Sequence, residues 1–159
     1  MGRKKGGCFF CRSLKERKNE KNLILYQGEC TFVVMNKYPY TNGHLMVVPK
    51  RHYLDLEQLD DRELAELIVV LKASTQVLKT VLGPHGFNIG MNIGKAGGGG
   101  EDHLHIHVVP RWTGDTNFMP VIGETKIIPE YLGKTYQKLH SAFRDFLGKK
   151  ESPERRMRR

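Results

Sequence analysis

Long apolar runs and abundant cysteine are both missing from this chain of 159 residues. No stretch approaches the roughly 18 apolar residues that a membrane-spanning helix needs, so we expect no membrane partner. The start of the chain, Met1-Gly2-Arg3-Lys4-Lys5, has no apolar region behind it and is not expected to be a signal peptide. Three cysteines, two of them in Cys8-Phe9-Phe10-Cys11, favour a reducing compartment and therefore a cytoplasmic protein.

Excess charge is also missing from the body of the chain, although the net charge is +9. Residues 1–7 carry three basic side chains, and residues 148–159 carry six basic and two acidic ones, which leaves +2 for residues 8–147. We expect one domain over residues 8–147, with flexible basic tails at 1–7 and 148–159. Such tails can attract nucleic acid without sequence preference, or they can serve only to keep the protein soluble.

Hydrophobic periodicity predicts five strands and two helices. The strands are expected at residues 22–27, 31–36, 45–48, 87–93 and 103–109, with a tight turn at Gly28-Glu29 between the first two. A long helix is expected between a capping box at residues 60–63 and Gly83-Pro84, and a second helix from near Pro129. These elements predict an α+β domain in which a mostly antiparallel sheet carries one long inserted helix and one C-terminal helix.

Three histidines, His103, His105 and His107, alternate with apolar residues in the last predicted strand. Because side chains alternate between the faces of a strand, the apolar residues should enter the core and the histidines should share the other face. Geometry argues against a single metal held by all three, because the outer two would lie about 13 Å apart and bonds to zinc are only about 2 Å long. At most two adjacent histidines could bind one ion. A neutral imidazole is, however, a competent nucleophile.

Four consecutive glycines, residues 97–100, lie shortly before these histidines. Glycine lets the backbone approach a ligand closely and offers N–H groups to anionic oxygens. The combination predicts a phosphate held against an imidazole. This suits cleavage of a phosphorus anhydride, whose negative charge must be neutralised before a neutral nucleophile can attack.

The run from His103 to Val109 resembles the signature of the histidine-triad family of nucleotide hydrolases and transferases. Residues 36–52, from Asn36 to His52, are similar to that family's first conserved block. Residues 110–120 and 127–130 resemble a narrower group, the bacterial phosphorylases and hydrolases of diadenosine tetraphosphate. The resemblance implies the histidine-triad fold and a homodimer formed by extension of the five-stranded sheet.

The resemblance also implies a role for each matching residue. His105 would attack the α-phosphorus and carry the nucleotide covalently, His107 would hydrogen-bond a phosphate or bridging oxygen, and His44 would orient the triad. The nucleotide would be held by Asn36 at the ribose, by Asn92 at a phosphate or bridging oxygen, by Val34 and Met46 at the base, and by Gly98, Gly99 and Gly100 at the phosphates. Many relatives have glutamine and a hydroxyl residue where this chain has Gly99 and Gly100, so backbone N–H groups, Lys95 or a water would have to contact the leaving group.

Cys8 and Cys11 have the spacing of half a zinc site. The resemblance implies that His52 and His103 complete a structural zinc site, while the next triad histidine performs the chemistry. The alternative is a pair of free thiols at a mobile end of the chain.

The function that the resemblance implies is cleavage of dinucleoside polyphosphates, above all diadenosine tetraphosphate, without a catalytic metal. Attack at the α-phosphorus releases ATP and leaves AMP on the enzyme, which water would release as AMP and phosphate as ADP. The small residues at 97–100, with Lys95 or Arg111 nearby in sequence, favour phosphate. Two alternatives remain: a nucleoside phosphoramidase or adenylyl-conjugate hydrolase, and a nucleic-acid-binding module that acts on adenylated ends through the basic tails.

Overall fold

The computed structural model describes residues 7–16, 19–98, 103–115 and 130–148. Five strands form one sheet in the order β1-β2-β3-β5-β4, and all four neighbouring pairs are antiparallel. The strands are β1 (Ile24–Gln27), β2 (Thr31–Met35), β3 (Leu45–Pro49), β4 (Gly86–Met91) and β5 (Ile106–Arg111). All five predicted strands are therefore present, but β5 begins at Ile106, so His103 and His105 precede the strand that was expected to contain them.

Both predicted helices are present, together with one that the sequence did not reveal. The helix α2 (Asp61–Leu82) begins at the predicted capping box, in which Asp60 accepts from the backbone N–H of Glu63 at 2.8 Å, and it ends at Gly83 with a left-handed φ of 57°. The helix α4 (Leu132–Leu147) follows Tyr131, whereas Pro129 lies outside the described residues. The unpredicted helix α1 (Phe9–Glu16) contains the second of the two N-terminal cysteines, and the short 3-10 helix η1 (Leu56–Gln58) precedes α2.

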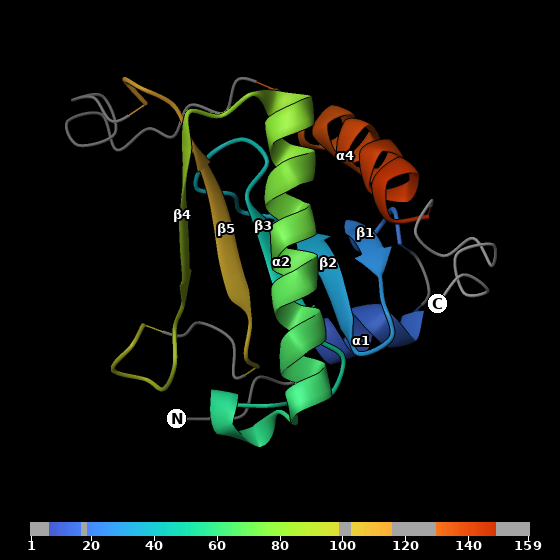
Figure 1. Ribbon diagram of the computed structural model, residues 1–159, viewed down its shortest axis with the longest axis vertical. Helices are drawn as coiled ribbons and strands as arrows, with labels where there is room; N and C mark the ends of the chain where they lie inside the picture. The colour runs from blue at the N-terminus through green and yellow to red at the C-terminus, as the bar shows by residue number, and fades with distance from the viewer. Residues whose placement is uncertain (1–6, 17–18, 99–102, 116–129, 149–159) are drawn as a thin grey trace, which may run out of the picture.

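The helices cover the two faces of the sheet unequally (Figure 1). The helices α2 and α4 lie side by side on one face and enclose the main core, whereas α1 lies behind the sheet in this view. A second, smaller cluster of buried side chains lies on that other face, formed by Phe10, Ile24, Phe32, Val34, Met46 and Val48. The strands β2 and β3 are thus buried on both faces, which explains why, apart from Thr31, their sequences are apolar.

The strand register sets the residues that surround the triad on the face away from α2. Met46 of β3 pairs with His107, which pairs on its other side with Gly90 of β4. Val34 of β2 pairs with Met46, so these four positions form one row across the sheet. One side of His107 is therefore lined by packed apolar side chains and the other side by a glycine.

Among the helices of the described part, none is long and apolar enough to cross a bilayer.

Candidate active site and metal cluster

The protonation of His105 is set by the backbone just before it. Nδ1 of His105 lies 2.7 Å from the carbonyl oxygen of His103, and because a carbonyl can only accept, Nδ1 carries the proton. The other ring nitrogen, Nε2, is then unprotonated and has a lone pair available. The His105 ring is 7% exposed, so this lone pair is presented from a largely buried position.

A chain of hydrogen bonds also sets the tautomer of His107. The backbone N–H of Tyr40 donates to Nδ1 of His44 at 3.2 Å, so the proton of His44 lies on Nε2. That Nε2–H donates to Nδ1 of His107 at 3.0 Å, which leaves the proton of His107 on its own Nε2. The Nε2 atoms of His107 and His105 are 3.2 Å apart, so a donor faces the lone pair of the candidate nucleophile.

Electrostatics keep His107 neutral. Burial, followed by the electrostatic effect of the neighbouring His105 ring, lowers the pKa of His107 to about 4 from its ordinary value of 6.5. A neutral His107 retains both the acceptor nitrogen that faces His44 and the N–H that faces His105. The three rings therefore form one ordered network, in which His44 donates to His107 and His107 donates to His105.

Cys8, Cys11, His52 and His103 meet in a second cluster, as the sequence predicted. Their four potential ligand atoms all lie within 4.8 Å of one another. Nδ1 of His103 lies 3.2 Å from Sγ of Cys8 and 3.6 Å from Sγ of Cys11. Nδ1 of His52 lies 3.5 Å from Sγ of Cys11 and 3.2 Å from Nδ1 of His103.

The four separations given above, from 3.2 to 3.6 Å, are close to those between the corners of a tetrahedral metal site. Bonds of about 2.3 Å to sulfur and about 2.05 Å to nitrogen require sulfur–nitrogen separations of about 3.6 Å and nitrogen–nitrogen separations of about 3.3 Å. Nε2 of His103 lies 3.0 Å from the carbonyl oxygen of Pro49, so Nε2 carries the proton and Nδ1 is free to coordinate. Burial lowers the pKa of His103 to about 4, which favours the neutral form that a metal requires. These four residues could hold a metal ion.

Phe10 lies between the triad and the metal cluster, by which we mean Cys8, Cys11, His52 and His103. Its ring centroid lies 5.4 Å from that of His103 and 5.1 Å from that of His105, and its side chain is 1% exposed. Because Phe10 lies between the two cysteines in sequence, the position of these cysteines also fixes where its ring meets His105. No role for Phe10 was predicted from the sequence, although its position inside the Cys8–Cys11 motif was the available signal.

The predicted nucleotide-binding residues lie around the triad in different ways. Oδ1 of Asn36 accepts from the backbone N–H of Tyr38 at 2.9 Å, and its Nδ2 lies 3.4 Å from Nδ1 of His44. Val34 and Met46 are buried in the smaller cluster, at 0% and 6% exposure. Gly98 has a left-handed φ of 80° in the turn after β4, whereas Gly99 and Gly100 lie outside the described residues. The binding roles of these residues remain predictions.

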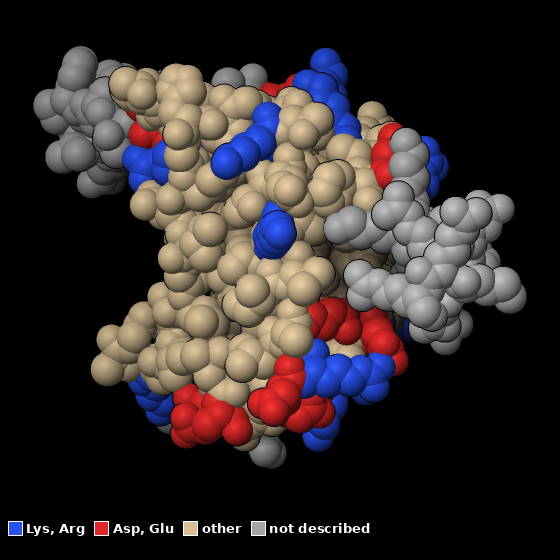
Figure 2. Space-filling model, in the orientation of Figure 1, with Lys and Arg blue, Asp and Glu red and all other residues tan. Residues whose placement is uncertain are grey.

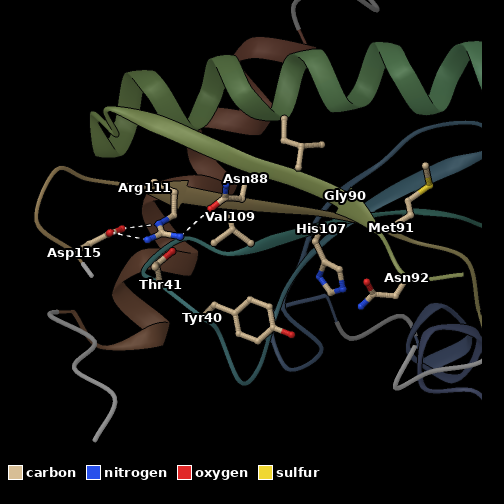
Figure 3. A pocket seen from close by; sticks show the side chains of 11 residues that line it. Tyr40, Thr41, Asn88, Gly90, Met91, Asn92, His107, Val109, Arg111 and Asp115 are labelled. Atoms are coloured by element: carbon tan, nitrogen blue, oxygen red, sulfur yellow. Dashed lines mark hydrogen bonds and ion pairs between the residues drawn. The ribbon is translucent and has the colours of Figure 1, made fainter. Parts of the chain in front are cut away.

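An open pocket of about 590 Å³ begins at His107 and lies over β4 and β5. Figure 3 shows His107 and Asn92 at one end and Arg111, Asn88 and Asp115 at the other, with Tyr40 at the side. Arg111 donates to both carboxylate oxygens of Asp115 at 2.7 Å and to Oδ1 of Asn88 at 2.8 Å. Of these residues, Asn92 and His107 were predicted as site residues from the sequence. Arg111 was predicted only as a source of positive charge for the phosphate acceptor, and Asn88, Asp115 and Tyr40 were not predicted.

Comparison with known proteins agrees with this geometry. The HIT domain family matches residues 16–114, more than half of the chain, and the protein belongs to this family. It is 48% identical over 122 residues to AP-4-A phosphorylase of Mycobacterium tuberculosis, an alignment that covers 76% of this chain but only 63% of that relative. It is 34% identical over 119 residues to an uncharacterised HIT-like protein of Methanocaldococcus jannaschii, covering 75% and 89% of the two chains. A zinc-bound histidine triad family protein from Mycobacterium smegmatis has a similar structure, with a TM-score of 0.73 at 26% identity and coverage of 91% and 98%.

Proposed function

We propose that the protein cleaves dinucleoside polyphosphates by transferring a nucleotidyl group first to His105 and then to phosphate or water. The orientation of His105 carries this proposal. Its Nδ1 is committed to the carbonyl oxygen of His103, and its unprotonated Nε2 faces the Nε2 of His107. A lone pair beside a fixed N–H group is the arrangement that attack on a phosphate requires.

The proposed reaction has two displacements. In the first, Nε2 of His105 forms a bond to the α-phosphorus, and the bond between that phosphorus and the bridging oxygen breaks, so the electron pair departs with the leaving group. His107 gives its Nε2 proton to the leaving oxygen. In the second, an oxygen of the acceptor attacks the phosphorus, the phosphorus–nitrogen bond breaks, and its electron pair returns to His105. The acceptor's proton restores the Nε2–H of His107.

We propose diadenosine tetraphosphate as the substrate and phosphate as the acceptor, so that the products are ATP and ADP. The support is the 48% identity to a protein named AP-4-A phosphorylase. Water as the acceptor would give ATP and AMP through the same intermediate. A nucleoside phosphoramidase would use the same residues on a smaller leaving group.

Turnover in oxygen-18 water, with and without phosphate, tests the proposal. ATP and unlabelled ADP are expected, and labelled AMP formed at the same rate with or without phosphate would contradict the proposed acceptor. His105→Ala should abolish turnover, since loss of a nucleophile costs many powers of ten. A folded variant that keeps more than about a tenth of the rate would exclude His105 as the nucleophile, because that loss is far below the roughly 10²-fold or more expected.

We also propose that the metal cluster, defined by Cys8, Cys11, His52 and His103, binds one structural zinc ion. Two thiolates and two imidazoles at tetrahedral spacing suit zinc, and the similar Mycobacterium smegmatis structure is described as zinc-bound. Zinc would hold α1 against the chain around His103. The reaction steps above require no metal.

We propose a homodimer in which two β4 strands pair and extend the sheet. Among the described strands, β4 pairs only with β5, and therefore lies at the edge of the sheet. Ile89 and Ile93 are 47% and 38% exposed, and Ile68 of α2 is 52% exposed. Figure 2 shows few charged side chains over the middle of the face that carries α2 and β4. Sedimentation should report a dimer for the wild type and a monomer for Ile89→Lys.

The cellular location and the role of the basic tails are further proposals. Among the described residues, Cys8, Cys11 and Cys30 form no disulfide, which is consistent with the proposed reducing, cytoplasmic location. Almost all of the basic tails, residues 1–7 and 148–159, lies outside the described residues. If they contact nucleic acid, their removal should abolish that binding without changing the turnover of small nucleotides.

A further inference from the structure

We propose that the groove between His107 and Arg111 receives the leaving nucleoside polyphosphate, and that Gly90 determines how large a leaving group the enzyme accepts. This inference rests on the proposed function and specifies its substrate class: nucleotides whose α-phosphorus carries a long, phosphate-linked leaving group. The groove is the pocket of about 590 Å³ over β4 and β5, a size typical of small-molecule sites.

The direction of the groove follows from the position of the nucleophile. The groove extends from His107 past Val109 to Arg111, as Figure 3 shows, whereas His105, two residues before His107 in the chain, does not line it. In a phosphoryl displacement the attacking and leaving atoms lie roughly in line with the phosphorus between them. A leaving group opposite Nε2 of His105 therefore departs past His107 and enters the groove.

The length of the groove favours several linked phosphates over a small leaving group. Two steps of about 6.6 Å along β5 separate His107 from Arg111, so the groove is about 13 Å long. Ammonia or a single phosphate would leave most of this length empty. Figure 3 shows polar side chains at both ends of the groove, Asn92 beside His107 and Asn88 beside Arg111, with Val109 between the two ends.

The far end of the groove offers fixed hydrogen-bond donors. Because Oδ1 of Asn88 accepts from Arg111, the amide Nδ2 of Asn88 is the group left to face a ligand. Asp115 fixes the guanidinium through two hydrogen bonds of 2.7 Å, and two further N–H groups of Arg111 have no acceptor among the described residues. Donors held in place in this way suit phosphate oxygens, and Asp115 offsets the charge of Arg111 so that a product can leave.

Gly90 leaves the groove open where it meets the triad. It pairs directly with His107, and a Cβ built on Gly90 would meet no described atom within 4 Å. Any larger side chain at position 90 would therefore extend into the groove without disturbing the fold. Gly86 of the same strand is the comparison position, because its Cβ would also meet no described atom within 4 Å. Gly86 pairs with Arg111 at the far end of the groove rather than with His107, and it does not line the groove.

Two substrates that transfer the same AMP group test this proposal. Diadenosine tetraphosphate releases ATP, whereas adenosine 5′-phosphoramidate releases only ammonia. Gly90→Val should lower the ratio of kcat/KM for the first substrate to that for the second by at least about tenfold, since steric discrimination in a pocket reaches this size. Gly86→Val should keep the wild-type ratio. An unchanged ratio in Gly90→Val, or an equal fall in both variants, would overturn the proposal.

Binding of inorganic tripolyphosphate separates failure of the groove from failure of the proposed function. If the wild type cleaves neither substrate, the proposed function is wrong, and the groove is judged by calorimetry alone. Weaker binding of tripolyphosphate to Gly90→Val than to the wild type or Gly86→Val would support an anion-binding groove. Equal binding to all three proteins, or no binding to any of them, would exclude it.

Discussion

The carbonyl oxygen of His103 accepts a hydrogen bond from Nδ1 of His105 at 2.7 Å, while the ring of His103 lies among Cys8, Cys11 and His52. One residue therefore contributes its side chain to the cluster of potential metal ligands and its backbone carbonyl to the hydrogen bond that holds His105. A shift in the ring of His103 would move the carbonyl that keeps the proton on Nδ1 of His105. The cluster and the triad should consequently respond to the same perturbations.

Removal of the metal should destabilise the protein before it stops catalysis. Protein purified without chelators should contain about one zinc ion per chain, and chelation should lower Tm more than it lowers the initial rate, because ligation contributes directly to the free energy of folding. Cys11→Ser should lower both zinc content and Tm, whereas Cys30→Ser, outside the cluster, should retain the zinc. Metal analysis that finds no zinc in the wild type would refute this prediction.

Phe10→Ala should damage both stability and catalysis. Truncation of a fully buried phenylalanine costs about 3–5 kcal/mol, and here it also removes the ring that packs against His105. Denaturant unfolding should show the loss of stability, and steady-state kinetics should show a fall in kcat that exceeds any change in KM. Phe10→Leu should retain much of the wild-type stability and kcat. Phe9→Ala, at a less buried neighbouring residue, should lower stability and kcat less than Phe10→Ala does. Unaltered kcat in Phe10→Ala would argue against contact-mediated positioning of His105.

His44→Phe should lower kcat about tenfold to a hundredfold, the usual range for residues that orient a functional imidazole from behind. The substitution keeps an aromatic ring but removes the donor to Nδ1 of His107, so the tautomer of His107 is no longer fixed. Tyr40→Phe is the control, because it retains the backbone N–H that His44 accepts. Equal rates in His44→Phe and the wild type would show that the tautomer of His107 is set in another way.

The free energy of unfolding should decrease as pH falls from about 6.5 toward 4. The pKa of His107 is about 4 in the folded protein and has the ordinary value of 6.5 when unfolded, so the unfolded chain binds more protons within this interval. The stabilisation is present above pH 6.5 and is lost on acidification. Since His44 and His105 contact His107 directly, the informative comparison is between the wild type and His107→Gln. In urea unfolding across this interval, the free energy of unfolding should depend less steeply on pH in His107→Gln than in the wild type. Equal slopes of unfolding free energy against pH would contradict the lowered pKa of His107.

Local sequence patterns were enough to predict the helices and strands whose ends are marked by specific residues. The capping box at Asp60 and the left-handed Gly83 delimit α2, and alternating apolar residues marked the strands. The Cys8–Cys11 spacing and the family's histidines predicted a cluster that the structure brings together. The helix α1 was missed because its eight residues have no acidic first turn and depend on burial of Phe10 against the sheet.

The groove was beyond sequence reasoning because it depends on long-range strand register. Asn88 faces the same surface as Arg111 only because Asn88 pairs with Val109, and neither residue has a local pattern that predicts this. The beginning of β5 was misplaced for a related reason. The alternation of His103 and His105 resembles a strand, but their rings and carbonyls bond to Pro49, the cysteines and each other rather than extending the ladder.

The contact between Cys8 and His103 joins residues that are 95 positions apart. The entropic cost of closing a loop grows with its length, so this contact should form late in folding, after the local β2–β3 hairpin and α2. A newly made chain should therefore acquire its sheet first and dock α1 last, when metal becomes available. If zinc binds there as proposed, its supply would set the time at which α1 docks on a synthesised molecule, and stopped-flow refolding should show a final phase whose rate depends on zinc concentration.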